Sequence, residues 1–267
     1  PKGMIIYTSE GRKKDIIDTG RVSRSFFATR AKYPLVVMID GGTASASELV
    51  AGALQDHDRA VIVGRPSFGK ALLMVPLALS DGSSLMMVVG HVRTPCGRIV
   101  QRSYRGQTLR DYYEGAWSSR DTTGRPSCKT DAGRTVYGGG GIVPDIMLPT
   151  PLGVPPWLER ISEDRLVLRW VGGYLDAHGA QYTTLDAFAA APAMPPAAVA
   201  DFRTFVASHG DSAATGDAAD RSLGRFLSLA VAAGKWGEPG YYRIAAVLDP
   251  DITTASHAFV TTELLGR

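Results

Sequence analysis

Apolar residues follow two different patterns along the chain. Up to about residue 148 they form short runs separated by turn-forming residues, which is typical of strands. Beyond the Pro-rich stretch 149–156 they recur every three or four positions, which is typical of amphipathic helices. The pattern predicts an α/β protein with a mixed sheet, followed by a mainly helical C-terminal region. We expect two domains, residues 1–150 and residues 151–267.

The centre of the first half is a predicted strand–helix–strand unit. Residues 35–39 form an unbroken apolar run, so we expect a strand that is buried on both faces, as in a parallel sheet. Residues 46–57 are expected to form a helix, and residues 61–63 the next strand. The apolar face of the expected helix consists of Leu49, Val50, Ala53 and Leu54. This order predicts a βαβ unit.

Further strands are predicted on both sides of this unit. Residues 4–8 form a short apolar run, and two longer runs, 70–79 and 84–93, are joined by the hairpin signal Asp81-Gly82. A third run covers residues 98–102. Hairpin strands are antiparallel whereas βαβ strands are parallel, so the sheet is expected to be mixed.

Three segments have no clear strand or helix period. Residues 12–32 are rich in Lys and Arg and are predicted to be a solvated connector, with a strand or helical turn around Phe26. Residues 103–137 are predicted to be a long surface insertion. In the second half, residues 187–200 are predicted to be a loop, and the clearest helical stripe is expected to end at Gly234.

Composition narrows the function classes. The hydrophobic content of 45% over 267 residues is enough for a sizeable core. A net charge of +3 is too small to indicate a nucleic-acid partner, and no apolar stretch reaches the ~18 residues of a membrane span. No metal-binding spacing is present, so we expect no metal and no cofactor. The chain begins at Pro1 without a methionine, which indicates a fragment or a processed piece of a longer protein.

The two cysteines, Cys96 and Cys128, flank a long polar stretch. They form a bridge if the compartment is oxidising and remain separate thiols if it is reducing. The sequence leaves both alternatives open. It also leaves open the oligomeric state and the role of the helical half.

The run from Gly41 to Glu48 is rich in small and hydroxyl-bearing residues. Ser45 and Glu48 fit the capping-box pattern, which is a purely structural role. A helix start also offers unpaired backbone N–H groups, so Ser45 is a candidate nucleophile. Lys70 is the candidate base, and a lysine acts as a base only as the neutral amine, which requires burial or suitable neighbours.

Two other chemistries are disfavoured. Residues 64–70 spell the G-x-x-x-x-G-K pattern of a phosphate loop, but Ala71 stands where that loop needs Ser or Thr, and a strand pattern follows. A Ser-His-Asp triad with His57 is excluded because the expected helix separates His57 from Ser45 by roughly 18 Å.

The run GGTASASELVAGALQDHDRAVIVGRPSFGKALL, residues 41–73, resembles the carboxy-terminal (tail-specific) processing proteases. The resemblance covers roughly residues 3–148 and includes the segments 94–98 and 141–146. That family consists of serine endopeptidases with a Ser-Lys dyad. The resemblance implies a hydrolase that cuts polypeptides near their C-termini through an acyl-enzyme. It also implies substrates bound in extended form, beside the hairpin 70–93, and a periplasmic or otherwise extracytoplasmic location.

Matched position by position, the resemblance puts the nucleophile on Ser45, the general base on Lys70 and an oxyanion N–H on Ala46. Asp56 falls on an aspartate that is sometimes given a supporting role, and we expect it to be structural. Met74 stands where many members have a glutamine that orients the lysine.

The chain also lacks two upstream parts of the family, a PDZ domain and a Leu-Arg-Gly-Asn-Pro-Gly-Gly segment. In the family that segment supplies a second oxyanion N–H and a neighbouring core strand. Loss of one oxyanion donor costs on the order of 100- to 1000-fold in rate. Together with Met74, this supports a second hypothesis, a catalytically silent peptide-binding or scaffold module.

Overall fold

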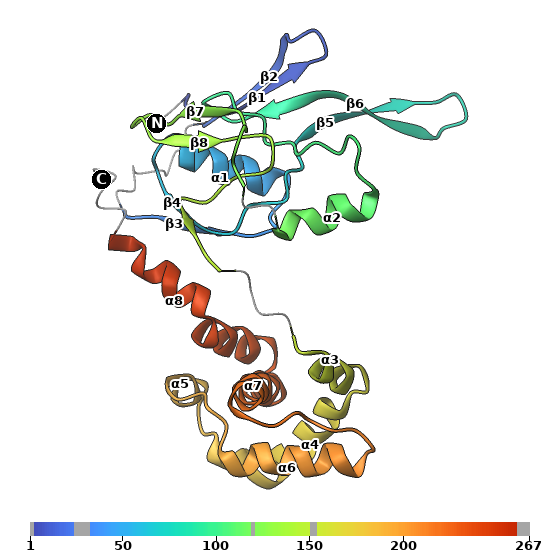
Figure 1. Ribbon diagram of the computed structural model, residues 1–267, viewed down its shortest axis with the longest axis vertical. Coiled ribbons are helices and arrows are strands. Elements are labelled where there is room, and N and C mark those ends of the chain that lie inside the picture. Colours follow the sequence, from blue (N-terminus) through green and yellow to red (C-terminus); the bar gives the residue numbers. More distant parts are fainter. Residues whose placement is uncertain (1–2, 24–32, 119–120, 150–153, 261–267) are drawn as a thin grey trace. The chain divides into compact units, whose positions relative to one another are not determined.

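The protein has two compact units (Figure 1). The structure, a computed structural model, describes residues 3–23, 33–118, 121–149 and 154–260. The first unit comprises Pro1–Thr150 and Thr254–Arg267, and the second comprises Pro151–Thr253. The predicted fold class, an α/β region followed by a mainly helical region, is confirmed. The first division falls after residue 150, but the chain from Thr254 belongs with the first unit and not with the helical one.

A small parallel sheet in the first unit carries the βαβ unit. Strand β3 (Val36–Ile39) leads into helix α1 (Ala46–Asp56) and then into strand β4 (Val61–Gly64). Strand β9 (Ile146–Met147) completes the order β3-β4-β9, and both pairings are parallel. The central strand β4 is buried along its whole length.

Strand β3 and helix α1 bury fewer of their own apolar side chains than their sequence patterns predict. In β3 only Ile39 is buried and Met38 is 42% exposed, because β3 has no neighbour on its outer edge among the described residues. In α1, Val50 is 55% exposed, although we expected it on the buried face. The helix buries Glu48, Ala51, Gly52, Ala53, Gln55 and Asp56. Polar residues at both ends of α1 therefore lie in the interior.

The second sheet of this unit is antiparallel, with the order β2-β1-β6-β5 (Figure 1). Its strands are β1 (Ile5–Gly11), β2 (Ile16–Arg21), β5 (Leu72–Ala78) and β6 (Ser84–Arg93). The predicted hairpin is therefore present as β5 and β6, and β5 lies at the edge of the sheet. Parallel and antiparallel strands lie in separate sheets. Strand β2 forms within the expected connector 12–32, and the element expected around Phe26 lies outside the described residues.

The insertion 103–137 contains regular structure that the sequence did not predict. Its elements are α2 (Leu109–Ser118), β7 (Ser127–Lys129) and β8 (Thr135–Tyr137). Helix α2 begins where Thr108 and Asp111 cap each other: Thr108 Oγ1 accepts the Asp111 N–H at 3.1 Å, and Asp111 Oδ2 accepts the Thr108 N–H at 3.3 Å. The predicted strand 98–102 is reduced to one isolated bridge, between Arg93 and Ile99.

The second unit is helical. Its elements are α3 (Pro156–Glu163), α4 (Leu166–His178), the 3₁₀ turn η1 (Gly179–Gln181), α5 (Leu185–Ala190), α6 (Pro196–Ser208) and α7 (Asp217–Leu248). The prediction of a loop at 187–200 was wrong, because Thr184 caps α5 and Pro196 starts α6. The helix that was expected to end at Gly234 continues a few residues further, to Gly237, whose non-helical backbone (φ 67°, ψ −157°) divides α7 into two helices. A Cβ at Gly234 would lie 2.6 Å from Val171, so this glycine allows α4 and α7 to approach each other.

The last helix, α8 (Pro250–His257), begins in the second unit and ends in the first. Ala255 and Ala258 belong to a buried cluster with Val61, Val63 and Leu148 around the parallel sheet. Within the described residues no helix is long and apolar enough to cross a membrane.

Candidate active site

Ser45 is the N-cap residue of α1, at the turn that follows β3. Its backbone has φ 59° and ψ −125°, a conformation that residues other than glycine rarely adopt. Such conformations cost about 1–3 kcal/mol and concentrate at functional sites. A strained serine between a strand and a helix is also the way in which α/β-hydrolases expose their nucleophile. Ser45 is exposed.

Ala46 is the first residue of α1 and directly follows Ser45. Its N–H has no acceptor within the helix, because the first four N–H groups of a helix have none. The N-terminus of a helix also carries a partial positive charge. A donor suited to an oxyanion therefore lies next to the candidate nucleophile.

Lys70 lies in the loop between β4 and β5, which backbone contacts hold in place. The Phe68 N–H donates to the Thr43 carbonyl at 2.8 Å, and the Gly69 carbonyl accepts the Arg102 N–H at 2.9 Å. Gly69 has a φ of 86°, and a Cβ there would lie 2.8 Å from Arg102 Cβ. Glycine is therefore required immediately before the lysine. Lys70 is exposed.

The carboxylate of Glu48 joins the two candidate catalytic residues. Its Oε2 accepts the backbone N–H of Ser45 at 2.9 Å and that of Lys70 at 2.8 Å. Its Oε1 accepts the N–H of Gly69 at 2.7 Å and the hydroxyl of Ser67 at 2.5 Å. The backbone nitrogens of Ser45 and Lys70 therefore lie close together, because both donate to the same oxygen, Glu48 Oε2. One carboxylate thus holds the start of α1 against the β4–β5 loop.

Glu48 is fully buried. Burial raises the pKa of the Glu48 carboxyl above its usual value, and the hydrogen bonds that the carboxylate accepts act in the opposite direction. The bonds use both carboxylate oxygens, so the ionised form matches the four donors around it. The capping-box partner of Ser45 is therefore also the anchor of the lysine loop.

The hydrogen bonds that connect Ser45 and Lys70 run through their backbone groups to Glu48. Among the bonds formed by the described residues, none joins the two side chains directly. Desolvation favours the neutral amine of a lysine. Because Lys70 is exposed, it needs cover from a substrate or from another polypeptide segment to act as a base.

Met74, at the position of the orienting glutamine, lies in β5 and is 43% exposed. Gln101 is a glutamine that the structure brings near Lys70, since both line one pocket. Its Oε1 accepts the Ala71 N–H at 2.8 Å, and its Nε2 donates to a backbone carbonyl at 2.8 Å and to Tyr112 Oη at 3.0 Å. Gln101 therefore holds the backbone beside Lys70.

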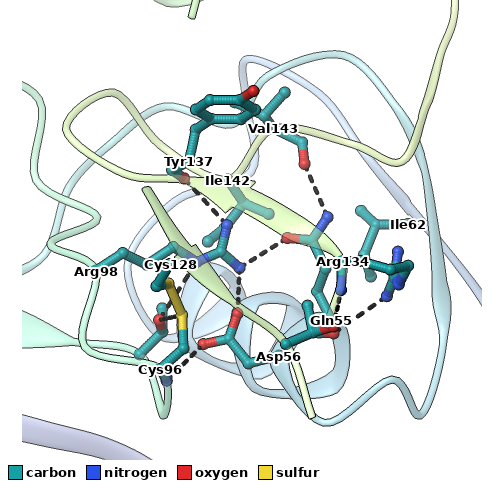
Figure 2. A network of polar contacts seen from close by, with 12 residues as sticks. Gln55, Asp56, Ile62, Cys96, Arg98, Cys128, Arg134, Tyr137, Ile142 and Val143 are labelled. Carbon is teal, nitrogen blue, oxygen red and sulfur yellow. Dashed lines mark hydrogen bonds and ion pairs between the residues drawn. A yellow bond between two sulfur atoms is a disulfide. The ribbon is translucent and has the colours of Figure 1, made fainter. Parts of the chain in front are cut away.

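Asp56 lies at the other end of α1, in the polar network of Figure 2. Its carboxylate accepts the Arg98 guanidinium at 2.7 Å and the Cys96 N–H at 3.0 Å. The side chains of Asp56 and Arg98 are each 1% exposed. Arg98 also donates to the Gln55 side chain at 2.7 Å and to the Tyr137 carbonyl at 3.0 Å. These contacts link Asp56 to the interior and not to Ser45.

His57 is the C-cap residue of α1, so the whole helix separates it from Ser45. Its Nδ1 lies 2.8 Å from the Asp131 carboxylate, and its Nε2 lies 2.8 Å from the Ile5 carbonyl. Both ring nitrogens are engaged in structural contacts. The structure does not bring His57 into a triad with Ser45.

Cys96 and Cys128 form a disulfide with a Cα–Cα distance of 6.0 Å (Figure 2). The bridge joins the turn after β6 to β7 and closes a loop that contains α2. It decides between the two alternatives that the sequence left open. The insertion is therefore covalently fastened near Asp56, at the end of α1 opposite Ser45.

Sequence reasoning missed the linking roles of Glu48, Ser67 and Gln101. A glutamate three residues after an N-cap serine is the ordinary capping-box signal, which says nothing about a loop some 20 residues later. Gln101 gave no signal because it lies within residues 98–102, which the sequence predicts to be an ordinary strand. The only available hint for Ser67 was its place just before Gly69 and Lys70.

The structure does not support a phosphate loop or a metal site. After Lys70 the chain enters strand β5, so the G-x-x-x-x-G-K run lacks the helix N-terminus that a phosphate loop uses. Within the stretches of chain that the structure describes, no group of three or more His, Cys, Asp or Glu side chains comes together as a metal site.

Residues 2–107, which include Ser45, Glu48 and Lys70, match the model of Peptidase family S41. Similar curated proteins include carboxyl-terminal-processing peptidase 2, chloroplastic, of Arabidopsis thaliana, 42% identical over 95 residues. A carboxy-terminal-processing protease of Bartonella bacilliformis is 41% identical over 100 residues. The predicted family resemblance is confirmed.

The family resemblance covers a limited part of each protein. The two alignments cover 35% and 38% of this chain, but 18% and 22% of the relatives. This chain therefore spans about a fifth of the length of these carboxyl-terminal-processing relatives. Among solved structures, a photosystem II D1 C-terminal processing protease matches with 26% identity and a TM-score of 0.38, over 58% of this chain and 29% of that chain.

Proposed function

We propose that this chain is part of the catalytic domain of a serine endopeptidase of the C-terminal processing type, with Ser45 as nucleophile and Lys70 as general base. The observation that carries the proposal is the Glu48 carboxylate, which accepts the N–H groups of both residues. A capping box needs only the contact with Ser45. The contact with Lys70 goes beyond capping and serves to keep the two residues together.

The reaction follows from the groups at the start of α1 and from Lys70 in the loop between β4 and β5. The neutral amine of Lys70 takes the proton of Ser45 Oγ as the oxygen attacks the scissile carbonyl carbon. The Ala46 N–H stabilises the oxyanion of the tetrahedral intermediate. The C–N bond then breaks, the lysine ammonium returns its proton to the leaving amine, and an acyl-enzyme remains. Water, deprotonated by Lys70, hydrolyses the acyl-enzyme and releases Ser45.

The substrate lies in extended form along the outer edge of β5. This strand is at the edge of its sheet and begins two residues after Lys70, so a peptide paired with it passes the lysine. Such a peptide also removes water from Lys70, which favours the neutral amine that the mechanism requires.

The open edge of β3 supports the expected contribution of an upstream segment. Among the described residues β3 has no partner on that side, and a hollow of ≈510 Å³ is lined by β3 and the start of α1. A further strand paired there ends beside the Gly41–Ser45 turn. We infer that it supplies the second oxyanion N–H.

A fluorophosphonate probe, which reacts with activated serines, tests the proposal on the full-length protein. Wild type and Ser47→Ala, a neighbouring exposed serine, are expected to be labelled, and Ser45→Ala to lose labelling. Lys70→Ala is expected to lose both labelling and cleavage of unfolded polypeptides. Equal labelling of wild type and Ser45→Ala would exclude Ser45 as the nucleophile.

A peptide-binding module without proteolysis is the second candidate. The exposure of Lys70 and Met74 at the site favours it. Under this alternative, extended peptides bind to wild type and Ser45→Ala with equal affinity, and no preparation is labelled or cleaves peptide.

We also propose an extracytoplasmic location. The Cys96–Cys128 disulfide supports it, because disulfides persist in oxidising compartments and are rare in the cytosol.

A further inference from the structure

A pocket of ≈360 Å³ opens beside Lys70. One wall comes from the lysine loop and the first residue of β5, and the other comes from the insertion. The lining includes Phe68, Leu72, Gln101, Leu109, Tyr112 and Tyr113. The volume lies at the small end of the range for ligand sites, so the pocket fits one large side chain better than a whole small-molecule ligand.

The aromatic wall of the pocket is held in place without a ligand. Tyr112 Oη accepts the Gln101 amide at 3.0 Å and donates to the Gly69 carbonyl at 3.4 Å. The Tyr112 ring meets the Phe68 ring edge-on, with centroids 5.5 Å apart. On another side the Arg102 guanidinium stacks on Tyr112, 4.7 Å from the ring centroid. A wall that is fixed in advance loses little entropy on binding.

The rim of the pocket exposes apolar surface to water. Leu109 is 75% exposed, Tyr113 is 56% exposed and Tyr104 is 53% exposed. No Asp or Glu is among the lining residues, and Lys70 is the only charged one. This surface suits a large uncharged side chain, and an aromatic one above all, since aromatic pairs add to the gain from burial.

We propose that this pocket selects substrates that carry a large apolar side chain next to the cleaved bond. The inference rests on the proposed protease function. A peptide paired with β5 passes Leu72, and alternate side chains of an extended peptide point to the same face, so one of them enters the pocket. Helix α2 lies beyond the matched segment 2–107, so this wall is a feature of the insertion and not of the matched segment.

The test uses the full-length protein and two peptides that differ only in a Phe or an Ala next to the cleaved bond, placed on each side in turn. Wild type is expected to prefer Phe by on the order of 10- to 100-fold in kcat/KM, as burial of an aromatic side chain provides. In Tyr113→Ala the ratio is expected to fall to about threefold or less. The ratio does not depend on the fraction of folded enzyme. Tyr242→Ala, an exposed tyrosine of the helical unit, keeps the wild-type ratio.

Leu109→Asp is a second variant that tests the charge of the rim. Asp in the first turn of a helix is favourable, and Leu109 is mostly exposed, so folding is preserved. It is expected to lower the Phe preference and to raise cleavage of a matched Lys peptide. A Phe-to-Ala ratio near one in wild type, or an unchanged ratio in both variants, overturns the proposal.

Binding to Ser45→Ala separates failure of the pocket from failure of the protease assignment. Fluorescence anisotropy with the labelled Phe and Ala peptides measures affinity without turnover. If no peptide is cleaved by wild type but the Phe peptide binds Ser45→Ala more tightly than the Ala peptide, the proposed pocket is supported and the proposed protease function is wrong. If Ser45-dependent cleavage occurs but the Phe and Ala peptides do not differ in rate or in binding, the proposed protease function is supported and the proposed pocket is wrong.

Discussion

The two ends of helix α1 use a buried carboxylate in opposite ways. At the C-terminal end, Asp56 is paired with the Arg98 side chain, and His57 is held through both ring nitrogens. At the N-terminal end, Glu48 accepts three backbone N–H groups and one hydroxyl, and the side chains of Ser45 and Lys70 remain exposed. The first arrangement uses side chains to hold the fold. The second fixes the backbone and leaves side chains available for chemistry.

The difference separates stability from reactivity along one helix. Ser45 has a strained backbone at the open end, whereas the closed end carries the disulfide and the Arg98 network (Figure 2). Strain at a functional residue persists only where its surroundings are firmly held. We therefore expect changes at the Asp56 end to reduce stability first, and changes at the Glu48 end to reduce activity first.

The largest loss of stability is expected from Asp56→Asn. It leaves the buried Arg98 guanidinium without its counter-charge, and breaking a buried pair in this way costs about 3–5 kcal/mol. Urea denaturation followed by circular dichroism measures the loss. Asp131→Asn, which removes the exposed partner of His57, is the control and should cost less than about 1 kcal/mol. If Asp56→Asn instead abolishes activity in protein that remains folded, stability and activity are not divided between the two ends of α1.

Removal of the disulfide is expected to cost slightly less. The bridge between Cys96 and Cys128 spans 32 residues, and loop closure of that length contributes about 3–4 kcal/mol. The Cys96→Ser and Cys128→Ser double variant should show this loss in urea denaturation, and wild type in reductant should match it. Equal stability of the oxidised and reduced proteins would contradict a stabilising role for the bridge.

Glu48→Gln is expected to cost about 2–3 kcal/mol in stability, because one carboxylate oxygen becomes an NH₂ group that faces backbone donors. Its distinguishing effect is on activity. Loss of the contact with Ser45 or Lys70 shifts the proposed dyad, and misplacement by about 1 Å lowers kcat on the order of 100-fold. Glu163→Gln, an exposed glutamate of α3, is the matched control. An unchanged kcat per labelled serine in Glu48→Gln would refute the linking role.

The sequence predicts the local elements of the first unit better than the contacts that join them. The βαβ unit, the hairpin and the N-cap position of Ser45 could be predicted, because each depends on local period or turn chemistry. The bond from Glu48 to Lys70 could not be predicted, because it joins residues 22 positions apart through a backbone group that no side-chain pattern marks. The aromatic wall of α2 has a local pattern, because Leu109, Tyr112 and Tyr113 fall at helical spacing. Its position beside Lys70 could not be predicted, because it depends on the contact of Tyr112 with the distant Gly69 carbonyl.

The smallest effect is a pH dependence that comes from Glu48. Burial raises the pKa of its carboxyl, so the folded chain binds that proton more tightly than the unfolded chain does. Between the unfolded value of about 4.3 and the raised folded value, the folded state holds more protons, and stability falls as the pH rises. The contribution is fully present below this range and is lost above it.

Glu48→Gln lacks this titration, so the free energy of unfolding of wild type minus that of the variant should decrease as the pH rises through the range and then level off. Urea denaturation of both proteins at steps between about pH 4 and pH 8 measures the difference. Glu163→Gln should follow wild type throughout. A difference that increases with pH would mean that the four hydrogen bonds outweigh burial. The Glu48 end would then resemble the Asp56 end, as a site whose ionised carboxylate mainly stabilises the fold.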